Sequence, residues 1–234
     1  MTAQHQLRGD VAVLVPAAGL GTRLGPGQPK ALRELGGQPL LVHAVRRIVA
    51  AESVGCVVIA APVDGRDDVA AMLAPEIPHD VELVVVAGGD TRQASVAAAL
   101  AATPDAYPVI LVHDAARAFA PVELIERVAQ AVRDGHDAVI PVLPVADTIK
   151  SVDESGFVVA TVDRAPLRVV QTPQGFARPA LAAAHAAAST DATDDAGLAE
   201  RIGLKVFCVA GDDAAFKVTR PGDLVRAEQL LRGA

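Results

Sequence analysis

Short apolar runs alternate along this chain with alanine-rich segments. The runs are VAVLV at 11–15, CVVIAA at 56–61, ELVVV at 82–86, VILVH at 109–113 and AVIPV at 138–142. Between them, Leu40, Leu41, Ala44, Val45 and Ile48 recur at the spacing of one helical face. The stretch 121–133 predicts a second helix with Pro121 at its first position. Strands that alternate with helices predict βαβ units, an α/β fold and a mainly parallel sheet.

The alternation stops near residue 143. Segment 143–172 predicts two or three extended pieces around the turn Asp153-Glu154-Ser155-Gly156. We therefore expect one domain over 1–234 with a protruding arm at 143–172, which would serve either association or closure over a site. A helix at 178–188, a polar stretch at 189–195, a strand at 205–209 and a final helix that begins at Pro221 are expected after the arm.

Composition narrows the class of protein. The chain has 234 residues, of which 51% are hydrophobic and 21% charged, which is typical of one large globular core. No apolar run approaches the roughly 18 residues that span a bilayer, so we expect a soluble, cytoplasmic protein without membrane contact. The net charge of −7 argues against nucleic acid as a partner, and local cations must then meet any anionic substrate. Cys56 and Cys208 both lie in apolar runs, which favours neither a disulfide nor a metal site.

A glycine-rich loop, PAAGLGTRLGPGQPKAL, follows the first predicted strand. Gly19 and Gly21 permit close approach of the backbone to a ligand, and Arg23 and Lys30 supply cations that suit a triphosphate. The loop lacks the third glycine of the dinucleotide fingerprint and the lysine of a Walker motif. For the glycines alone a structural turn is an equal alternative, and the two cations favour a phosphate site.

Two further motifs end predicted strands. Asp114 follows VILVH at the carboxyl edge of the sheet, where a carboxylate suits ribose hydroxyls or a magnesium ion. The alternative is an ion pair between Asp114 and Arg117 that caps the strand end. The motif GGDTRQAS predicts a turn followed by a helix, and its glycines alone would indicate no more than that turn.

The ordered set PAAGLGTRLGPGQPKAL, GGDTRQASV, VHDAARAF, DTIK, TVDR, TPQGF and FKVTRP resembles the 2-C-methyl-D-erythritol 4-phosphate cytidylyltransferase family over about residues 11 to 230. The resemblance implies a Rossmann-like three-layer nucleotidyltransferase fold with an inserted β-arm. It also implies transfer of CMP from CTP to methylerythritol phosphate with Mg²⁺ as the cofactor. A phosphate oxygen would attack the α-phosphorus of CTP without a general base, so the chemistry depends on positioning and charge neutralisation.

The resemblance also implies roles for individual residues. Arg23 and Lys30 would stabilise charge around the α-phosphate, with Arg164 and Lys217 as further catalytic residues. The CTP site would contain Ala17, Ala18, Gly19, Gly89, Asp90, Ser95 and Asp114, with Asp114 as the candidate metal ligand. The acceptor would contact Asp114, Arg117, Thr148, Arg164, Thr172 and Lys217. Thr148 and Arg164 would come from the partner subunit of a homodimer.

Two positions depart from the family pattern, and several alternatives stay open. Ala118 stands where proline is usual, and Asp195 replaces the glutamate of a Thr-Asp-Glu-Ala stretch. The alternatives are a nucleotidyltransferase for another sugar or alditol phosphate and a non-catalytic nucleotide-binding protein. A glycosyltransferase is disfavoured because the sequence has no Asp-x-Asp motif. The histidines show no metal-ligand spacing, so none is given a catalytic role.

Overall fold

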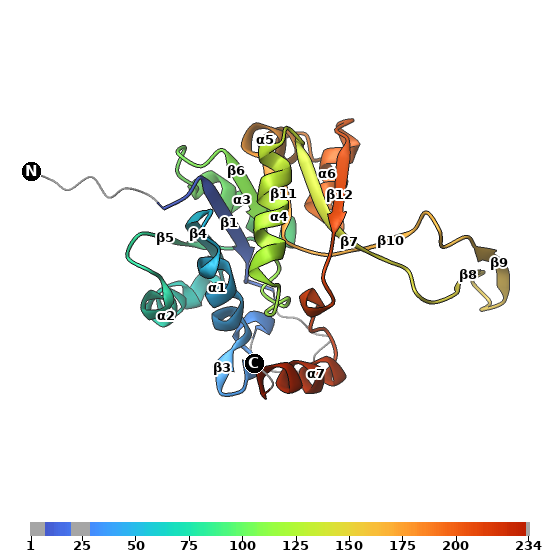
Figure 1. Ribbon diagram of the computed structural model, residues 1–234, viewed down its shortest axis with the longest axis horizontal. Helices are drawn as coiled ribbons and strands as arrows, with labels where there is room; N and C mark the ends of the chain where they lie inside the picture. The colour runs from blue at the N-terminus through green and yellow to red at the C-terminus, as the bar shows by residue number, and fades with distance from the viewer. Residues whose placement is uncertain (1–7, 20–28, 233–234) are drawn as a thin grey trace, which may run out of the picture.

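An eight-stranded, mainly parallel sheet forms the centre of the computed structural model, which describes residues 8–19 and 29–232 (Figure 1). The strand order is β10-β7-β11-β6-β1-β4-β5, with β12 paired to β7. Strands β1, β4, β5 and β6 are parallel neighbours, whereas β11 runs antiparallel between β6 and β7. The sheet strands are β1 (Val11–Pro16), β4 (Val54–Ala61), β5 (Glu82–Ala87), β6 (Val109–Val112), β7 (Ala138–Pro144), β10 (Arg168–Val170), β11 (Gln174–Ala177) and β12 (Val206–Ala210).

Helices cover both faces of this sheet. They are α1 (Leu40–Ala50), α2 (Arg66–Leu73), α3 (Arg92–Ala102), α4 (Val122–Arg133), α5 (Arg178–Ala186) and α6 (Asp195–Arg201). The helix α7 (Pro221–Arg232) lies below the sheet in Figure 1. Short 3-10 turns, η2 (Lys30–Leu32), η3 (Val63–Gly65), η4 (Ala74–Glu76) and η5 (Asp213–Ala215), and the small pair β2 (Glu34–Leu35) and β3 (Gln38–Pro39) complete the body. The predicted three-layer α/β fold is confirmed.

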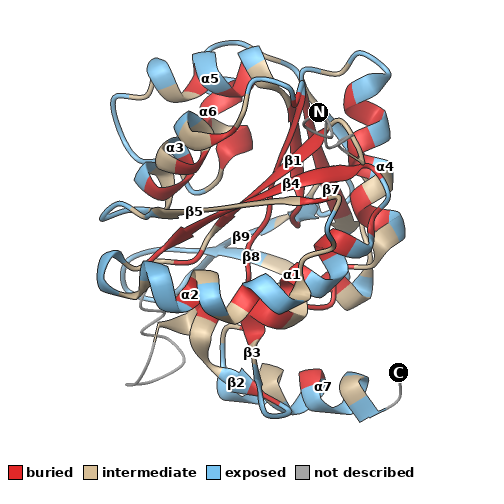
Figure 2. Ribbon diagram, turned by 90° about the vertical axis from the view of Figure 1, so that its left-hand side faces the viewer, coloured by how far each residue is buried: buried red, intermediate tan, exposed pale blue. Residues whose placement is uncertain are grey.

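Two apolar cores lie on opposite faces of the sheet, as the alternation of side chains along β1 requires. Val11, Val13 and Val15 pack with α1, α2 and α4, while Ala12 and Leu14 pack with α3, α5 and α6. The central strands are buried along their length (Figure 2). Burial on both faces explains why VAVLV and CVVIAA are continuous apolar runs rather than alternating ones.

The helices and strands lie close to the predicted ranges, with differences at two helix starts. All five predicted strands are present, and α7 begins at Pro221 as expected. Pro121 is the N-cap of α4 rather than its first helical residue. The polar stretch 189–195 ends in the first residue of α6, which the apolar pattern did not reveal because α6 has only seven residues.

The arm leaves the body between β7 and β10 and extends away from the sheet (Figure 1). Its hairpin consists of β8 (Ile149–Val152) and β9 (Val158–Val162), joined through the predicted turn. The ends of segment 143–172 stay in the main sheet, since β10 pairs with residues 142–144 of β7. The protruding part is therefore shorter than expected from the sequence. Among the residues that the structure describes, no helix is both long and apolar enough to cross a membrane.

Candidate active site

A pocket of about 640 Å³ opens at the carboxyl ends of β1, β4, β5 and β6, where parallel sheets commonly bind ligands. It brings together most of the residues predicted for the nucleotide. Its walls are formed by Pro16, Ala17, Ala18, Gly19, Lys30, Ala31, Pro62, Val63, Gly88, Gly89, Asp90, Thr91, Arg92, Ser95, Asp114, Ala115, Ala116 and Lys217.

Backbone and small side chains form one wall. The amide of Ala17 donates to the carbonyl of Ala60 at 2.8 Å, and that of Gly88 donates to the carbonyl of Ala61 at 2.7 Å. The end of β4 therefore fixes the loops that follow β1 and β5. A Cβ atom at Gly88 would lie 2.5 Å from the Cβ of Ala18, so only glycine permits these loops to approach so closely.

Ser95 fixes the loop before α3. Its Oγ accepts the amide proton of Gly89 at 3.1 Å and donates to the carbonyl of Thr91 at 2.9 Å. Thr91 is the N-cap of α3, and its side chain accepts the amide proton of Ala94 at 3.0 Å. The Ser95 hydroxyl thus holds the Gly89–Asp90 segment against the helix, in addition to lining the pocket.

Asp114 lies at the centre of the charged wall. Its carboxylate pairs with Lys217 Nζ at 2.5 Å and with Arg92 Nε at 3.2 Å. Burial by itself would raise the pKa of Asp114, but the charges of Arg92 and Lys217 hold it well below its usual range. Asp114 is therefore ionised at neutral pH. The alternative pair with Arg117 is not formed, because the Arg117 guanidinium donates to the carbonyls of Ala215 and Val170 instead.

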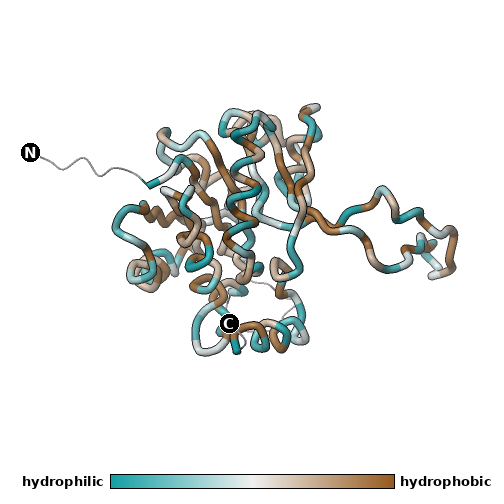
Figure 3. The backbone as a smooth tube through the Cα atoms, viewed as in Figure 1, coloured by the Kyte–Doolittle hydropathy of each residue, from teal (hydrophilic) through white to brown (hydrophobic). Residues whose placement is uncertain are grey.

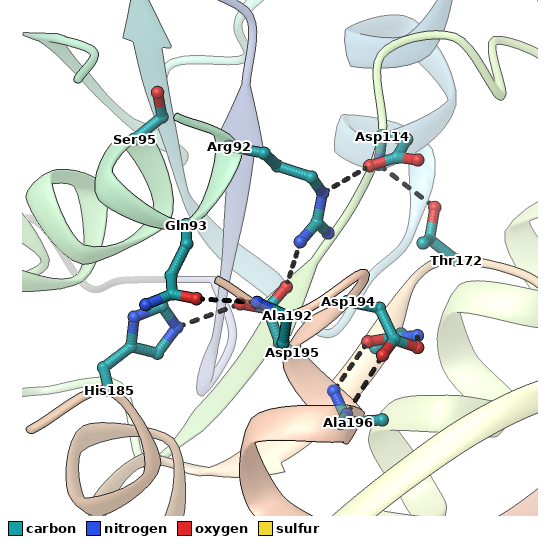
Figure 4. A network of polar contacts seen from close by, with 12 residues as sticks. Arg92, Gln93, Ser95, Asp114, Thr172, His185, Ala192, Asp194, Asp195 and Ala196 are labelled. Atoms are coloured by element: carbon teal, nitrogen blue, oxygen red, sulfur yellow. Dashed lines mark hydrogen bonds and ion pairs between the residues drawn. The ribbon is translucent and has the colours of Figure 1, made fainter. Parts of the chain in front are cut away.

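Arg92 also contacts a carboxylate behind the pocket (Figure 4). Its Nη1 donates to Asp195 Oδ2 at 2.7 Å, and His185 Nε2 donates to Asp195 Oδ1 at 2.9 Å. Burial would lower the pKa of Arg92, but Asp195 and Asp114 raise it above its ordinary value. The shorter side chain of Asp195, which departs from the family pattern, thus still reaches Arg92.

A second chain of hydrogen bonds holds the backbone of Asp114. Its amide donates to Thr172 Oγ1 at 3.0 Å, and Thr172 Oγ1 lies 3.2 Å from His113 Nδ1. His113 Nε2 contacts the carbonyl of Arg117 at 3.3 Å, and because a carbonyl only accepts, we assign the ring proton to Nε2. Burial lowers the pKa of His113 to about 4, so this histidine is neutral and structural at neutral pH.

The two lysines of the pocket come from segments far apart in the sequence. The amide of Lys30 donates to the carbonyl of Gly19 at 3.2 Å, which brings η2 back to the start of the glycine-rich loop. The amide of Val218, next to Lys217, donates to the carbonyl of Ala116 at 2.8 Å. Both segments share a small apolar cluster of Leu35, Leu40, Ala118, Phe119, Val218 and Ala227. Buried Ala118 therefore has a packing role at the position where the family usually has proline.

Other predicted site residues lie elsewhere. Arg23 falls outside the described residues. Thr172 and Arg117 lie behind Asp114 and do not line the pocket. Thr148 and Arg164 are exposed on the arm, where Arg164 Nη1 donates to the carbonyl of Ala146. The described part of the chain contains no cluster of three or more histidine, cysteine, aspartate or glutamate side chains that would hold a metal alone.

Sequence reasoning missed Arg92 and His185. Arg92 was present in the motif GGDTRQASV, and its one available signal was a cation at the start of a predicted helix, where cations are disfavoured. His185 gave no signal, because its partner Asp195 belongs to a different helix.

The chain is similar to known proteins over most of its length. Residues 11–233 match the family model described as 2-C-methyl-D-erythritol 4-phosphate cytidylyltransferase. The protein of that description from Saccharopolyspora erythraea is 53% identical over 228 residues, covering 95% of this chain and 99% of the relative. The one from Streptomyces coelicolor is 52% identical over 227 residues, covering 94% of this chain and 84% of the relative.

Solved structures agree with the sequence relatives. The crystal structure of the 2-C-methyl-D-erythritol 4-phosphate cytidylyltransferase from Thermus thermophilus has a TM-score of 0.77 at 39% identity and covers 95% of this chain and 99% of that chain. The structure of 4-diphosphocytidyl-2C-methyl-D-erythritol synthase from Anaerococcus prevotii has a TM-score of 0.81 at 27% identity, with 96% and 99% covered.

Proposed function

The chain belongs to the 2-C-methyl-D-erythritol 4-phosphate cytidylyltransferase family, and we propose that the pocket around Asp114 is its active site. The enzyme transfers the cytidylyl group of CTP to 2-C-methyl-D-erythritol 4-phosphate in isoprenoid biosynthesis. The observation that carries the proposal is the meeting of Lys30, Lys217 and Asp114 beside a wall of small residues.

The reaction needs charge neutralisation more than proton transfer. A phosphate oxygen of the acceptor forms a bond to the α-phosphorus of CTP while the bond to the β-phosphate oxygen breaks, and pyrophosphate leaves with the electron pair. The nucleophile is already an anion near neutral pH, so no general base is required. Lys30 and Arg23 neutralise the charge that develops at the α-phosphorus, and Lys217 orients the attacking phosphate. His113 takes no part, since both ring nitrogens are occupied by protein contacts.

The nucleotide base is recognised by the wall of small residues. Ala17, Ala18, Gly19 and Gly89 line the pocket with no side chain larger than a methyl group, so the base can lie close to the main chain, and Ser95 holds Gly89 in place. Cytosine differs from uracil in the donor and acceptor pattern of its edge, and fixed main-chain groups discriminate such patterns well. Asp90 lies at the rim of the same wall.

Magnesium fits this pocket as an ion shared with the substrate. Mg²⁺ usually binds one or two carboxylates together with phosphate oxygens and water. Asp114 and Asp90 are carboxylates of the pocket wall, and of these Asp114 would hold the ion through the lone pairs that its contacts with Arg92 and Lys217 leave free. When bound, the ion shields the mutual repulsion of the two anionic substrates.

The acceptor site is completed by the arm of a second subunit. Arg164 and Thr148 are exposed and do not line the pocket of their own chain. On the arm, Phe157 is exposed to 73% and Val159 to 68%, as expected of a surface that packs against a second copy. Figure 3 shows hydrophobic stretches along the backbone of the arm. Thr172 and Arg117 hold the backbone and loop behind Asp114 and so shape the acceptor side from within.

A pyrophosphate-release assay tests the proposal. It crosses ATP, CTP, GTP and UTP with methylerythritol 4-phosphate and with other polyol phosphates, in the presence and absence of Mg²⁺. We expect release only with CTP, methylerythritol phosphate and the metal together. Efficient release with another polyol phosphate would favour the alternative acceptor. Binding of CTP without release from any acceptor would favour a non-catalytic nucleotide-binding protein.

A further inference from the structure

We propose that Arg92 is a positioning residue for Asp114, and that Asp195 and His185 anchor it from behind the pocket. The three side chains fix the direction in which the Asp114 carboxylate faces the nucleotide. This inference rests on the proposed function of the pocket, because it takes Asp114 to be the carboxylate that meets the substrate.

The geometry connects four side chains in a row (Figure 4). Arg92 donates to Asp114 through Nε at 3.2 Å and to Asp195 through Nη1 at 2.7 Å. A guanidinium is planar and rigid, so the bond to Asp195 also fixes the direction of Nε. His185 occupies the other oxygen of Asp195 at 2.9 Å, which prevents the Asp195 carboxylate from turning.

The segment that carries Asp195 is itself firmly attached. Asp194 is the N-cap of α6, and its carboxylate accepts from Gln174 Nε2 at 2.7 Å. Gln174 Oε1 in turn accepts the amide proton of Ala196 at 3.1 Å. Gln174 lies opposite Val112 in the sheet, two residues before Asp114. The anchor and Asp114 are therefore tied to the same pair of strands.

The positions of Arg92 and Asp195 both conflict with local structural preferences. Arg92 is the first residue of α3, where the helix dipole disfavours a cation. Asp195 is a carboxylate with 1% of its surface exposed, and buried ion pairs are often replaced by apolar residues without loss of stability. Such conflicts with local preference concentrate at functional sites.

The consequence for Asp114 is a fixed orientation. Arg92 holds Oδ1, while Oδ2 contacts Lys217 at 2.5 Å. Without the bond to Arg92, the carboxylate gains freedom to rotate about its side-chain torsion. A displacement on the scale of 1 Å typically costs on the order of a hundredfold in rate.

The test is a double-mutant cycle between Arg92→Lys and Asp114→Asn, with turnover measured at saturating substrates. Lysine keeps the charge but lacks the fork that reaches two carboxylates. We expect Arg92→Lys to lower kcat about 10- to 100-fold in the wild-type background and less than about twofold in the Asp114→Asn background. Equal factors in both backgrounds, or no loss in the wild-type background, would overturn the inference. Asp195→Asn should behave in the same way.

Arg201→Lys is the matched control. Arg201 is exposed and donates to the carbonyls of Thr190 and Asp191, which lie in the loop before α6, and not to Asp195. We expect its kcat and thermal midpoint to match those of the wild type.

A crystal structure of ligand-free Arg92→Lys gives a readout that does not require activity. We expect Asp114 Oδ1 to leave its wild-type position while Oδ2 keeps its contact with Lys217, whereas an unchanged carboxylate would overturn the inference. The crystal structure of Arg92→Lys tests the positioning role of Arg92 even when Asp114→Asn is too slow to assay. A wild-type protein inactive with CTP would refute the proposed function alone, since the orientation of Asp114 is judged independently.

Discussion

Two inactive variants should restore activity to each other if the arm of one subunit completes the pocket of its partner. Lys30 lines the pocket of its own chain, whereas Arg164 lies beyond β9 on the protruding arm and does not line that pocket. In a mixed dimer of Lys30→Ala and Arg164→Ala, one site combines the altered pocket with the altered arm. The other site combines the intact pocket with the intact arm and should work normally.

The size of the recovery follows from this geometry. With random exchange of subunits, about half of the dimers are mixed, and each mixed dimer has one intact site of its two. The activity should therefore recover to about a quarter of the wild-type value. Neither variant alone should approach this level, because each homodimer carries the same lesion in both sites.

The assay measures pyrophosphate release after subunit exchange. Native mass spectrometry of differently tagged subunits verifies that the exchange has taken place. The matched control mixes Lys30→Ala with Lys217→Ala, since both lysines line the pocket of one chain. Every site in that mixture carries a lesion, so no activity should return. Verified exchange without recovery in the first mixture would refute the shared site. Recovery in both mixtures would mean that Lys30 and Lys217 serve different sites.

Three further predictions concern single positions. Lys30→Ala should lower kcat by about 10²- to 10³-fold at saturating CTP. Lys205 is an exposed lysine outside the pocket, and Lys205→Ala should keep the wild-type kcat. Near-normal turnover of Lys30→Ala would exclude Lys30 from catalysis. Gly88→Ala should weaken CTP binding in calorimetry, because the new Cβ would lie 2.5 Å from the Cβ of Ala18. A Cβ at Gly222 would meet nothing within 4 Å, so Gly222→Ala should bind CTP normally. Because burial lowers the pKa of His113 from 6.5 to about 4, the unfolded chain binds a proton in this range that the folded protein excludes. The stability from neutral His113 is present above pH 6.5 and is lost as the pH falls toward 4. This loss, about 3 kcal/mol, should be absent from urea unfolding of His113→Gln, and equal pH dependence of both proteins would contradict it.

The sequence predicts the parallel part of the fold well because its central parallel strands β1, β4 and β6 are buried on both faces. VAVLV and CVVIAA have no exposed side chains that would obscure their strand character. The sequence does not predict the antiparallel insertion of β11 between β6 and β7, because the four residues Gln174–Ala177 carry no alternation that specifies a neighbouring strand. That insertion follows from tertiary packing, which a local pattern does not record.

The same distinction explains which site residues were predicted. The glycine-rich loop and Asp114 follow directly from strands, so the common edge of a parallel sheet is enough to bring them together. Lys217 was placed by family resemblance alone, because its segment reaches the pocket through a bond to Ala116 and an apolar cluster formed with α7. Arg92, Asp195 and His185 meet across α3, α6 and α5, and no spacing within one element encodes such a contact.

The carboxylates of the pocket resolve an apparent conflict between charge and substrate. A protein with a net charge of −7 has to accept two anionic substrates at one point. Lys217 and Arg92 would repel each other and turn toward water if Asp114 did not lie between them. Asp114 therefore stabilises both cations in their places before any substrate arrives, and Asp195 holds the Arg92 guanidinium from behind. Fixed dipoles and charges that need no rearrangement during the reaction are the main source of electrostatic catalysis, which is why a buried carboxylate benefits a site for anions.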